Sequence, residues 1–394
     1  MNPDRIVPTT CPFCGVGCQI QLHIKDEQIV NVTADFEMPP NYGQLCVKGR
    51  FGTDFVHHPT RLTQPLIRKD IAAGSTPGKA RRANSLAEDY REASWDEALD
   101  LVATQLARVV AESGGDAIGT YCSAKVTNED NYLFQKLVRG LLGTNNIDHC
   151  ARLCHAGSVA GLMRTIGSAA MSNSIAEMEH LEVFIVTGSN TTFAHPVIAL
   201  SLKKAVARGA KLIVIDPRRI ELVDFATLWL QQRPGTDVVV FQAMAHVIVA
   251  EKLYDADYIV RHTEGFDEYA DSLAECTPEW AEEISGVPAE KIRQAARLYA
   301  RANAAPIYWG MGISQSTHGA DNATALVNLA MLCGHIGKYG GGLNPLRGQN
   351  NVQGCSDVGG LPNVYPGYQP VNDIGQPAHI GTTLHIVLAP DRIQ

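Results

Sequence analysis

The sequence predicts an α/β protein in which a small β-rich domain is followed by two α/β domains, one of them a doubly wound, Rossmann-like parallel sheet. The first sixty residues contain four cysteines, short β-branched runs and Gly/Pro turns, and they lack helical periodicity. From residue 181 onward, strand patterns alternate with helix patterns, which is typical of parallel sheets. The predicted divisions are 1–60 for the β-rich domain, 135–302 for the Rossmann-like domain, and 61–134 with 303–394 for a discontinuous α/β domain.

Individual elements follow from capping signals and periodicity. Ser94 as N-cap, Glu97 three residues later and Gly114 at the far end predict a helix between them. The strand pattern PIYWG is expected to begin a separate sheet. The remaining elements predicted for the Rossmann-like domain are the strands LEVFIVTG and AKLIVIDP and the helices PVIALSLKKAVARG, VVVFQAMAHVIVAEKL and SGVPAEKIRQAARLYARAN.

The composition excludes several classes of protein. With 33 basic and 41 acidic residues, the formal charge is −8, which disfavours a nucleic-acid-binding surface. No stretch approaches the roughly 20 apolar residues that a membrane-spanning helix needs, so membrane insertion is not expected. The N-terminus shows neither a signal peptide nor a twin-arginine pair, and a cytoplasmic location is expected. In a reducing compartment, 10 cysteines indicate metal binding or catalysis.

Four of these cysteines form a metal-ligand pattern. Cys11, Cys14 and Cys18 make a C-x2-C-x3-C motif, and Cys46 follows at a distance. Glycines between the first three allow the backbone to wrap closely around a metal centre. Three grouped ligands and one remote ligand favour a [4Fe–4S] cluster, while a structural zinc site is the alternative.

Longer motifs carry a resemblance to a known family. The segments CPFCGVGC with LCVKGRFG, GTNNIDHCARLCHAGSVAGL, GSNTTFAHP, IDPRR and PLRGQNNVQGCSDVGGLPNVYPGYQPV resemble the catalytic subunit of molybdenum-dependent formate dehydrogenases. These enzymes belong to the molybdopterin oxidoreductase superfamily, which also includes nitrate reductases. The resemblance implies oxidation of formate to CO2 at a molybdenum (or tungsten) bis-molybdopterin guanine dinucleotide centre, with electrons leaving through a [4Fe–4S] cluster on the four cysteines above.

The resemblance also implies roles for single residues. Cys154 corresponds to the molybdenum ligand, and a soft thiolate suits that role; Cys150 is its rival within the motif. His155 is expected to handle the proton, because imidazole titrates near neutrality. Arg347 is expected to bind formate, because its guanidinium matches a carboxylate with two parallel hydrogen bonds.

Further residues are implied at the cofactors. Lys48 is expected on the electron path between cluster and pterin, and Gln349 near the pterin. Glycines that permit close approach to phosphate and carboxylates that accept guanine N–H groups are expected in the two βα loops and in RPGTD. These dinucleotide-binding candidates are Gly188, Asn190, Asp216, Arg218, Gly235 and Asp237.

The chain departs from the family in one respect. Family members are longer and continue into a further β-rich domain that holds the second dinucleotide, whereas this sequence stops at APDRIQ. The competing hypotheses are a nitrate reductase of the same superfamily and a truncated, non-catalytic iron–sulfur protein for electron transfer. The expected partner is an electron-accepting subunit or carrier of the iron–sulfur, flavin/NAD or ferredoxin type. Cys122, Cys276, Cys333 and Cys355 are expected to be structural thiols.

Overall fold

The computed structural model describes residues 2–69 and 86–372, and the chain forms two compact units. One unit combines Met1–Phe51 with Cys150–Asn350, and the other combines Gly52–His149 with Asn351–Gln394. The chain therefore passes between the units three times, after Phe51, after His149 and after Asn350. The sequence predicted three domains with other boundaries, and that division stays a prediction.

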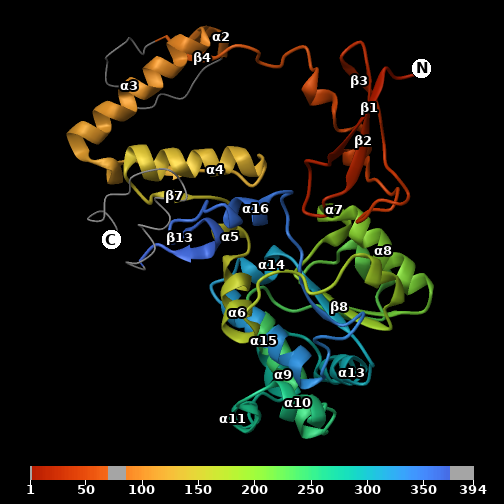
Figure 1. Cartoon of the computed structure of the whole chain (residues 1–394). Helices are drawn as coiled ribbons and strands as arrows, with labels where there is room; N and C mark the ends of the chain where they lie inside the picture. Colours follow the sequence, from red (N-terminus) through yellow and green to blue (C-terminus); the bar gives the residue numbers. More distant parts are fainter. Residues whose placement is uncertain (1, 70–85, 373–394) are drawn as a thin grey trace. The chain divides into compact units, whose positions relative to one another are not determined.

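The N-terminal segment is β-rich, as predicted. It forms an antiparallel sheet of β1 (Arg5–Thr10), β2 (Gln19–Lys25) and β3 (Gln28–Thr33), shown in red in Figure 1. Two residues with positive φ, Asp26 and Glu27, join β2 to β3, which is the geometry that tight hairpins require. The cysteine motif CPFCGVGC therefore forms the connection between β1 and β2.

The main body of the first unit is a parallel sheet of five strands, which confirms the doubly wound architecture. The strand order is β10-β9-β8-β11-β12, so the chain first adds strands on one side of β8 and later on the other. The expectation that PIYWG begins a separate sheet is wrong, because β11 pairs directly with β8. The bounds are β8 Val183–Thr187, β9 Lys211–Ile215, β10 Leu228–Leu230, β11 Pro306–Trp309 and β12 Gly342–Pro345.

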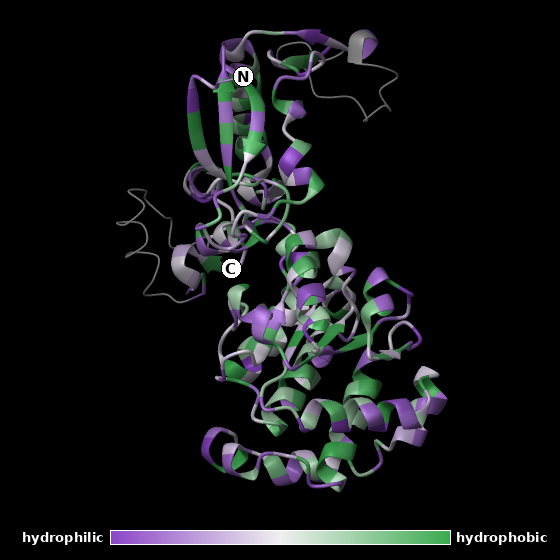
Figure 2. Cartoon of the chain, turned by 90° about the vertical axis from the view of Figure 1, so that its right-hand side faces the viewer, coloured by the Kyte–Doolittle hydropathy of each residue, from purple (hydrophilic) through white to green (hydrophobic). Residues whose placement is uncertain are grey.

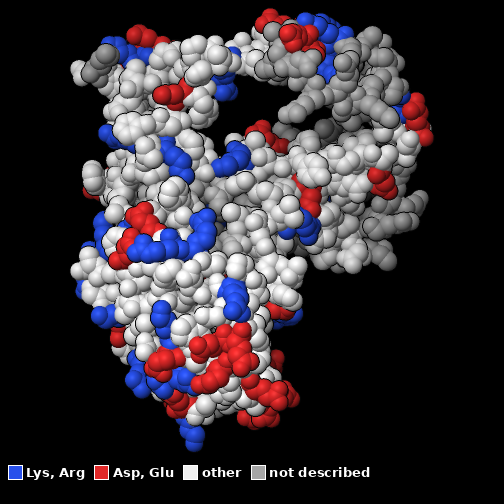
Figure 3. Space-filling model, turned by 180° about the vertical axis from the view of Figure 1, so that it is seen from behind, with Lys and Arg blue, Asp and Glu red and all other residues white. Residues whose placement is uncertain are grey.

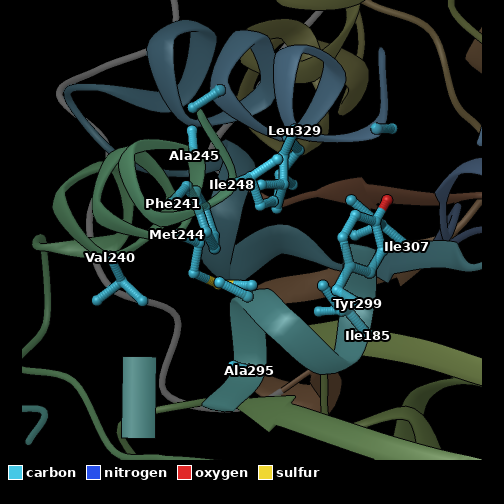
Figure 4. Packing of buried hydrophobic residues seen from close by; sticks show 14 of the residues in the cluster. Ile185, Val240, Phe241, Met244, Ala245, Ile248, Ala295, Tyr299, Ile307 and Leu329 are labelled. Atoms are coloured by element: carbon cyan, nitrogen blue, oxygen red, sulfur yellow. The ribbon is translucent and has the colours of Figure 1, made fainter. Parts of the chain in front are cut away.

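Helices cover both faces of this sheet because side chains alternate along buried strands. In β8, Ile185 belongs to one apolar cluster and Phe184 to another. Figure 4 shows part of the first cluster, in which Tyr299 lies beside Ile185 and Ile307 and Phe241 lies beside Met244. The long helices of this body are α8 Pro196–Ala207, α9 Asp237–Ala250, α13 Ala289–Ala300 and α15 Gly319–Leu332.

The shorter elements of the first unit connect these strands and helices. In Figure 2 its helices carry alternating green and purple bands, as expected for helices with one apolar and one polar face. These shorter elements are α1 Val47–Phe51, α5 Ala151–Cys154, α6 Ala156–Ile166, η4 Ala176–His180, α7 Thr191–Ala194, η5 Glu221–Phe225, α10 Ala256–His262, α11 Phe266–Ser272, α12 Pro278–Ser285 and α14 Met311–Ser314.

The second unit contains the predicted capped helix. In α3 (Trp95–Ser113), the Ser94 hydroxyl accepts a bond from the Glu97 N–H at 3.1 Å, and Gly114 ends the helix. Two short ladders, β4–β5 and β6–β7, accompany it. Its other elements are η1 Asp54–Val56, β4 Leu66–Arg68, α2 Leu86–Asp89, β5 Tyr90–Glu92, η2 Gly115–Ala117, β6 Thr120–Tyr121, α4 Asn128–Leu137, η3 Val138–Leu142, β7 Ile147–Asp148, α16 Val352–Asp357, β13 Val364–Tyr365, η6 Pro366–Tyr368 and β14 Gln369–Pro370.

Surface charge is mixed in sign. On the face shown in Figure 3, basic and acidic side chains are interspersed, and acidic ones gather towards the end of the molecule where Figure 1 places α10 and α11. Among the helices of residues 2–69 and 86–372, none is both long and apolar enough to cross a membrane.

Candidate active site

The four cysteines of the N-terminal motif lie in one neighbourhood. The Cys11 N–H donates to the Cys18 carbonyl at 2.8 Å, which closes the loop between β1 and β2. Cys46 directly precedes α1, and a Cβ on Gly49 of that helix would lie 3.6 Å from the Cys11 Sγ. Burial, and then the charges of the other three cysteines, raise the pKa of Cys18 to about 12.

This donor set fits an iron–sulfur cluster. Within the described residues, no three His, Cys, Asp or Glu side chains are grouped to hold a single metal ion. A [4Fe–4S] cluster does not need such a grouping, because each of its four thiolates binds a different iron. Buried thiols that resist deprotonation become thiolates when a metal centre supplies the compensating positive charge. Cys11, Cys14, Cys18 and Cys46 would be its ligands.

A second set of candidate residues lies at the carboxyl edge of the parallel sheet. The strand order reverses between β8 and β11, and ligands of doubly wound sheets bind at such a switch point. The loops after these strands touch: the Gly312 N–H donates to the Gly188 carbonyl at 3.0 Å. A Cβ on Gly188, whose φ is +54°, would lie 2.8 Å from the Ile313 nitrogen, so this approach requires glycine.

Residues 187–195, which run from the last residue of β8 through α7 and are called here the loop after β8, hold buried polar atoms without a protein partner. They are the Asn190 Oδ1, the hydroxyl oxygens of Thr187 and Thr192, and the His195 Nδ1. Buried polar groups are usually hydrogen-bonded, so several orphans in one loop at a switch point indicate a polar ligand there. The donor and acceptor chemistry of this loop fits a dinucleotide-bearing pterin.

Two acidic candidates lie close together on the neighbouring part of this edge. Asp216 follows β9 and accepts a bond from the Arg218 N–H at 2.9 Å, while Asp237 begins α9 and accepts one from Gln232 at 2.8 Å. Burial raises the pKa of both carboxyl groups, and the charge of Asp216 adds to the effect on Asp237. N–H donors of a bound ligand would relieve this cost. Gly235, with φ +84°, turns the chain just before α9.

The candidate metal ligand and the candidate substrate arginine are neighbours. Cys154 ends α5 with a buried thiol, and Arg347 follows β12. Burial raises the pKa of the Cys154 thiol, whereas the charge of Arg347 and the Gly348 N–H lower it. The Arg347 guanidinium also donates to the Ala169 carbonyl. The site therefore combines a soft ligand with a cation that can bind an anionic substrate.

His155 is part of a hydrogen-bond chain with one possible direction. The Trp309 Nε1 donates to the Ser158 Oγ at 2.8 Å, the two hydroxyls of Ser158 and Ser314 lie 2.5 Å apart, and the Ser314 Oγ lies 3.1 Å from the His155 Nδ1. On the other side of the ring, Nε2 lies 3.0 Å from the Leu346 carbonyl. Because indole only donates and a carbonyl only accepts, His155 carries its proton on Nε2.

Both ring nitrogens of His155 are thus engaged. Burial, followed by the charge of Arg347, lowers the pKa of His155 to about 4, so the ring is neutral at pH 7. His155 can accept a proton at Nδ1 only after the Ser314 hydroxyl turns away.

The remaining candidates take distinct places. The Cys150 thiol donates to the Gln349 Oε1 at 2.8 Å, so the rival cysteine is bound by the loop that carries Arg347. Lys48 lies two residues after Cys46, and its Nζ lies 3.5 Å from the Phe193 carbonyl. Its ammonium thus reaches from the cluster segment to the loop after β8.

Several residues that build this site were not among those that the sequence predicted. The His195 Nε2 donates to the Arg347 carbonyl at 2.6 Å and helps to hold that loop. His195 could have been found because it lies within the motif GSNTTFAHP, directly before its final proline. Ser158 and Ser314, which are hydrogen-bonded in series to His155, and Gln232, which donates to Asp237, have no distinctive spacing in the sequence. The missed residues are Ser158, His195, Gln232 and Ser314.

Comparisons with known proteins agree with these features. A family model described as "Molybdopterin oxidoreductase" matches residues 61–392, and one described as "Molybdopterin oxidoreductase Fe4S4 domain" matches residues 4–58. The chain is 44% identical to the F420-dependent formate dehydrogenase subunit alpha of Methanocaldococcus jannaschii over 94% of its length, and 44% identical to formate dehydrogenase H of Escherichia coli over 93%. It covers 52% and 50% of those proteins, so it spans about half the length of the curated relatives it matches.

A solved structure shares the fold. Acetylene hydratase from Pelobacter acetylenicus superposes with a TM-score of 0.70 at 25% identity, covering 83% of this chain and 43% of that chain. Together, the matches confirm the predicted family, with a domain for a [4Fe–4S] cluster and a domain of the molybdopterin type. This chain belongs to the molybdopterin oxidoreductase family.

Proposed function

We propose that this chain is the N-terminal part of a formate dehydrogenase catalytic subunit that oxidises formate to CO2. The observation that carries the proposal is that the charge of Arg347 acts on the buried Cys154 thiol, where it offsets part of the rise in pKa that burial causes. Formate is a small carboxylate, and a guanidinium beside the metal ligand would bind and orient it. The two curated relatives described above are named as formate dehydrogenases, which supports the same reaction.

Each residue would have a separate task. Cys154 would bind molybdenum or tungsten of a bis-molybdopterin guanine dinucleotide, the group that accepts the two electrons of formate. Arg347 would hold the carboxylate through its guanidinium, the group that also donates to the Ala169 carbonyl. His155 would fix the Arg347 loop through Leu346 and would take up the proton at Nδ1 when the Ser314 hydroxyl rotates.

The cofactor contacts would come from the sheet edge and the N-terminal motif. The orphaned polar atoms of the loop after β8, with Asp216 and Asp237, would bind one dinucleotide. Lys48 would link that region to the cluster ligands, and Gln349 would lie beside the pterin. The electrons would pass to an iron–sulfur, flavin or ferredoxin-type partner in the cytoplasm.

The fold alone does not select this reaction. The acetylene hydratase that superposes on this chain is named for the addition of water, so the scaffold is compatible with other chemistry. Nitrate reduction on the same scaffold is the second candidate. An arginine fork binds nitrate as well as formate, so the substrate has to be measured.

The test is formate-dependent reduction of an electron-accepting dye by anaerobically purified protein, in whatever assembly this chain forms. Iron, molybdenum and tungsten are measured on the same sample. We expect turnover, and we expect Arg347→Lys to raise the KM for formate about tenfold or more, because lysine lacks the fork. Arg208→Lys, at an exposed ion pair with Glu179, is the matched control. Nitrate consumption without formate turnover, or iron without molybdenum or tungsten, would contradict the proposal.

A further inference from the structure

Two cysteines outside the candidate active site lie side by side in the second unit. Cys122 follows β6 and Cys355 lies in α16, 233 positions further along the chain. Their Sγ atoms are 3.4 Å apart. Cys355 is fully buried, whereas Cys122 is only partly buried, so a small molecule can reach the first sulfur and not the second.

The surroundings of the two sulfurs are tightly packed. A Cβ on Gly360 would lie 2.7 Å from the Cys122 Sγ and 2.8 Å from the Cys355 Sγ, so only glycine leaves room for both thiols. The Cys122 thiol also lies 3.3 Å from the Gly360 carbonyl oxygen. The hydrogen bond from Cys355 is the largest cause that lowers the pKa of Cys122. The sulfur that a small molecule can reach is therefore one whose pKa is lowered by its neighbour, which favours the reactive thiolate.

This pair lies beside two of the three places where the chain passes between the compact units, the crossings after His149 and after Asn350. We call residues 148–150 and 350–352 the crossing segments. The Cys122 N–H donates to the Asp148 carbonyl at 3.0 Å, and Asn351 at the other crossing donates to the Ala124 carbonyl at 3.0 Å. One crossing segment leads towards Cys154, and the other follows Arg347 in the sequence.

We propose that Cys122 and Cys355 form a redox-responsive thiol pair that hydrogen peroxide converts into a disulfide. The Cys122 thiolate attacks one peroxide oxygen, which breaks the O–O bond and gives a sulfenic acid and one water after protonation. The Cys355 sulfur then attacks the sulfenic sulfur and releases a second water. Two thiols lose two electrons and two hydrogens, and the peroxide is reduced to two waters.

The geometry allows this bond with a small movement. A disulfide requires a sulfur separation of about 2.05 Å, so the sulfurs have to approach by roughly 1.4 Å, which side-chain rotation can supply. The bond would join the end of β6, which binds Asp148, to α16, which begins at Val352, the last residue of the second crossing segment. Oxidation would therefore restrict both crossing segments, whatever reaction the active site catalyses.

The test uses anaerobically purified, cofactor-loaded protein treated with a few equivalents of hydrogen peroxide and then alkylated. Trypsin places Cys122 in peptide 109–125 and Cys355 in peptide 348–392, and each peptide contains no other cysteine. We expect these two peptides to be joined, with a mass about 2 Da below their sum, and to separate on reduction. We also expect slower hydrogen exchange in the crossing segments of the oxidised protein.

Variants make the outcome specific. Cys122→Ser and Cys355→Ser should each abolish the joined peptide and the slower exchange. Cys276→Ser is the matched control, because Cys276 is also partly buried but its sulfur lies 3.9 Å from the Ser272 carbonyl oxygen, not beside a thiol. Sulfinic acid at Cys122 without a joined peptide, or two thiols that stay alkylatable after peroxide, would overturn the proposal. Iron content, measured in parallel, shows whether peroxide attacked the cluster instead.

Discussion

The Nε2 atom of His155 donates to the main-chain oxygen of Leu346 across 3.0 Å. This bond connects the residue after the candidate metal ligand Cys154 to the residue before the candidate substrate arginine, Arg347. Ser314 holds the other ring nitrogen, so the imidazole is fixed in one tautomer. The histidine thus acts first as a positioning residue for the loop that carries the cation.

The low pKa of His155 predicts the pH dependence of the reaction. Because burial and Arg347 lower its pKa from 6.5 to about 4, His155 stays neutral from pH 7.5 down to about pH 5. We expect kcat/KM for formate to show no loss between pH 7.5 and 5.5. In the same window the unfolded chain binds a proton that the folded chain does not, so His155 makes the folded state less stable as the pH falls from 6.5 towards 4. A loss of activity centred near pH 6.5 that disappears in His155→Gln would contradict this prediction.

Gly15 allows a steric test of the contact between the cysteine motif and the loop that carries Arg347. The Gly15 N–H donates to the Gly348 carbonyl at 3.1 Å, and a Cβ at position 15 would lie 2.1 Å from the Arg347 carbonyl oxygen. Gly15→Ala should displace this loop and lower kcat/KM for formate about tenfold or more, since misplaced groups lose orientation. Gly119→Ala, at an open position, should leave it unchanged. Equal kinetics for the two variants would rule out a tight contact.

Replacing the buried Asp237 is expected to raise the stability of the cofactor-free chain and to lower its retention of the cofactor. Burial and Asp216 raise the pKa of Asp237, so the charged form destabilises the cofactor-free chain at pH 7, and acid relieves this cost as the pH falls towards the raised pKa. Asp237→Asn should melt at a higher temperature without cofactor, and Gln232 has a buried, unpaired Oε1 that can accept from the new amide. The same variant should copurify with less molybdopterin. A lower melting temperature with full pterin content would contradict both expectations.

Removing the guanidinium of Arg139 is expected to destabilise the second unit strongly. This buried guanidinium donates to the carbonyl oxygens of Gly359 (2.6 Å), Leu361 (2.7 Å) and Val364 (2.9 Å). Arg139→Met leaves these acceptors without a donor and should cost about 3 kcal/mol, seen as roughly 100-fold faster amide exchange over residues 359–365. Arg261→Met, at an exposed pair, should change that exchange little. Unchanged exchange in Arg139→Met would show that other contacts hold this segment.

The sequence predicted local structure better than long-range pairing. The strand β8 and the helix α3 were predictable because burial alternation and capping are properties of consecutive residues. The place of β11 was not, because it pairs with β8 only after more than 100 intervening residues, and periodicity carries no information on which strands pair. After this long connection, β11 pairs with β8 on the side opposite β9. From the sequence alone, a strand in that position is equally compatible with a new sheet.

The candidate site divides in the same way. Three thiols of the N-terminal motif are close in sequence, so their spacing predicted a metal centre. Ser158 and Ser314 serve His155 only through the folding of α6 and α14 against each other, and a serine in a helix pattern has no visible partner. His195 binds the Arg347 carbonyl from a loop 152 positions earlier, a contact that spacing cannot reveal.

The most direct test of the account is X-ray absorption fine structure at the molybdenum or tungsten edge, compared among the wild type, Cys154→Ser and Cys150→Ser. We assign the metal to Cys154, because the charge of Arg347 acts to lower the pKa of the Cys154 thiol. The Cys150 thiol instead donates a hydrogen bond to Gln349. We predict that Cys154→Ser loses one sulfur neighbour of the metal together with formate turnover, and that Cys150→Ser keeps the wild-type sulfur shell. An unchanged metal environment in Cys154→Ser, or the loss of a sulfur neighbour in Cys150→Ser, would contradict this assignment.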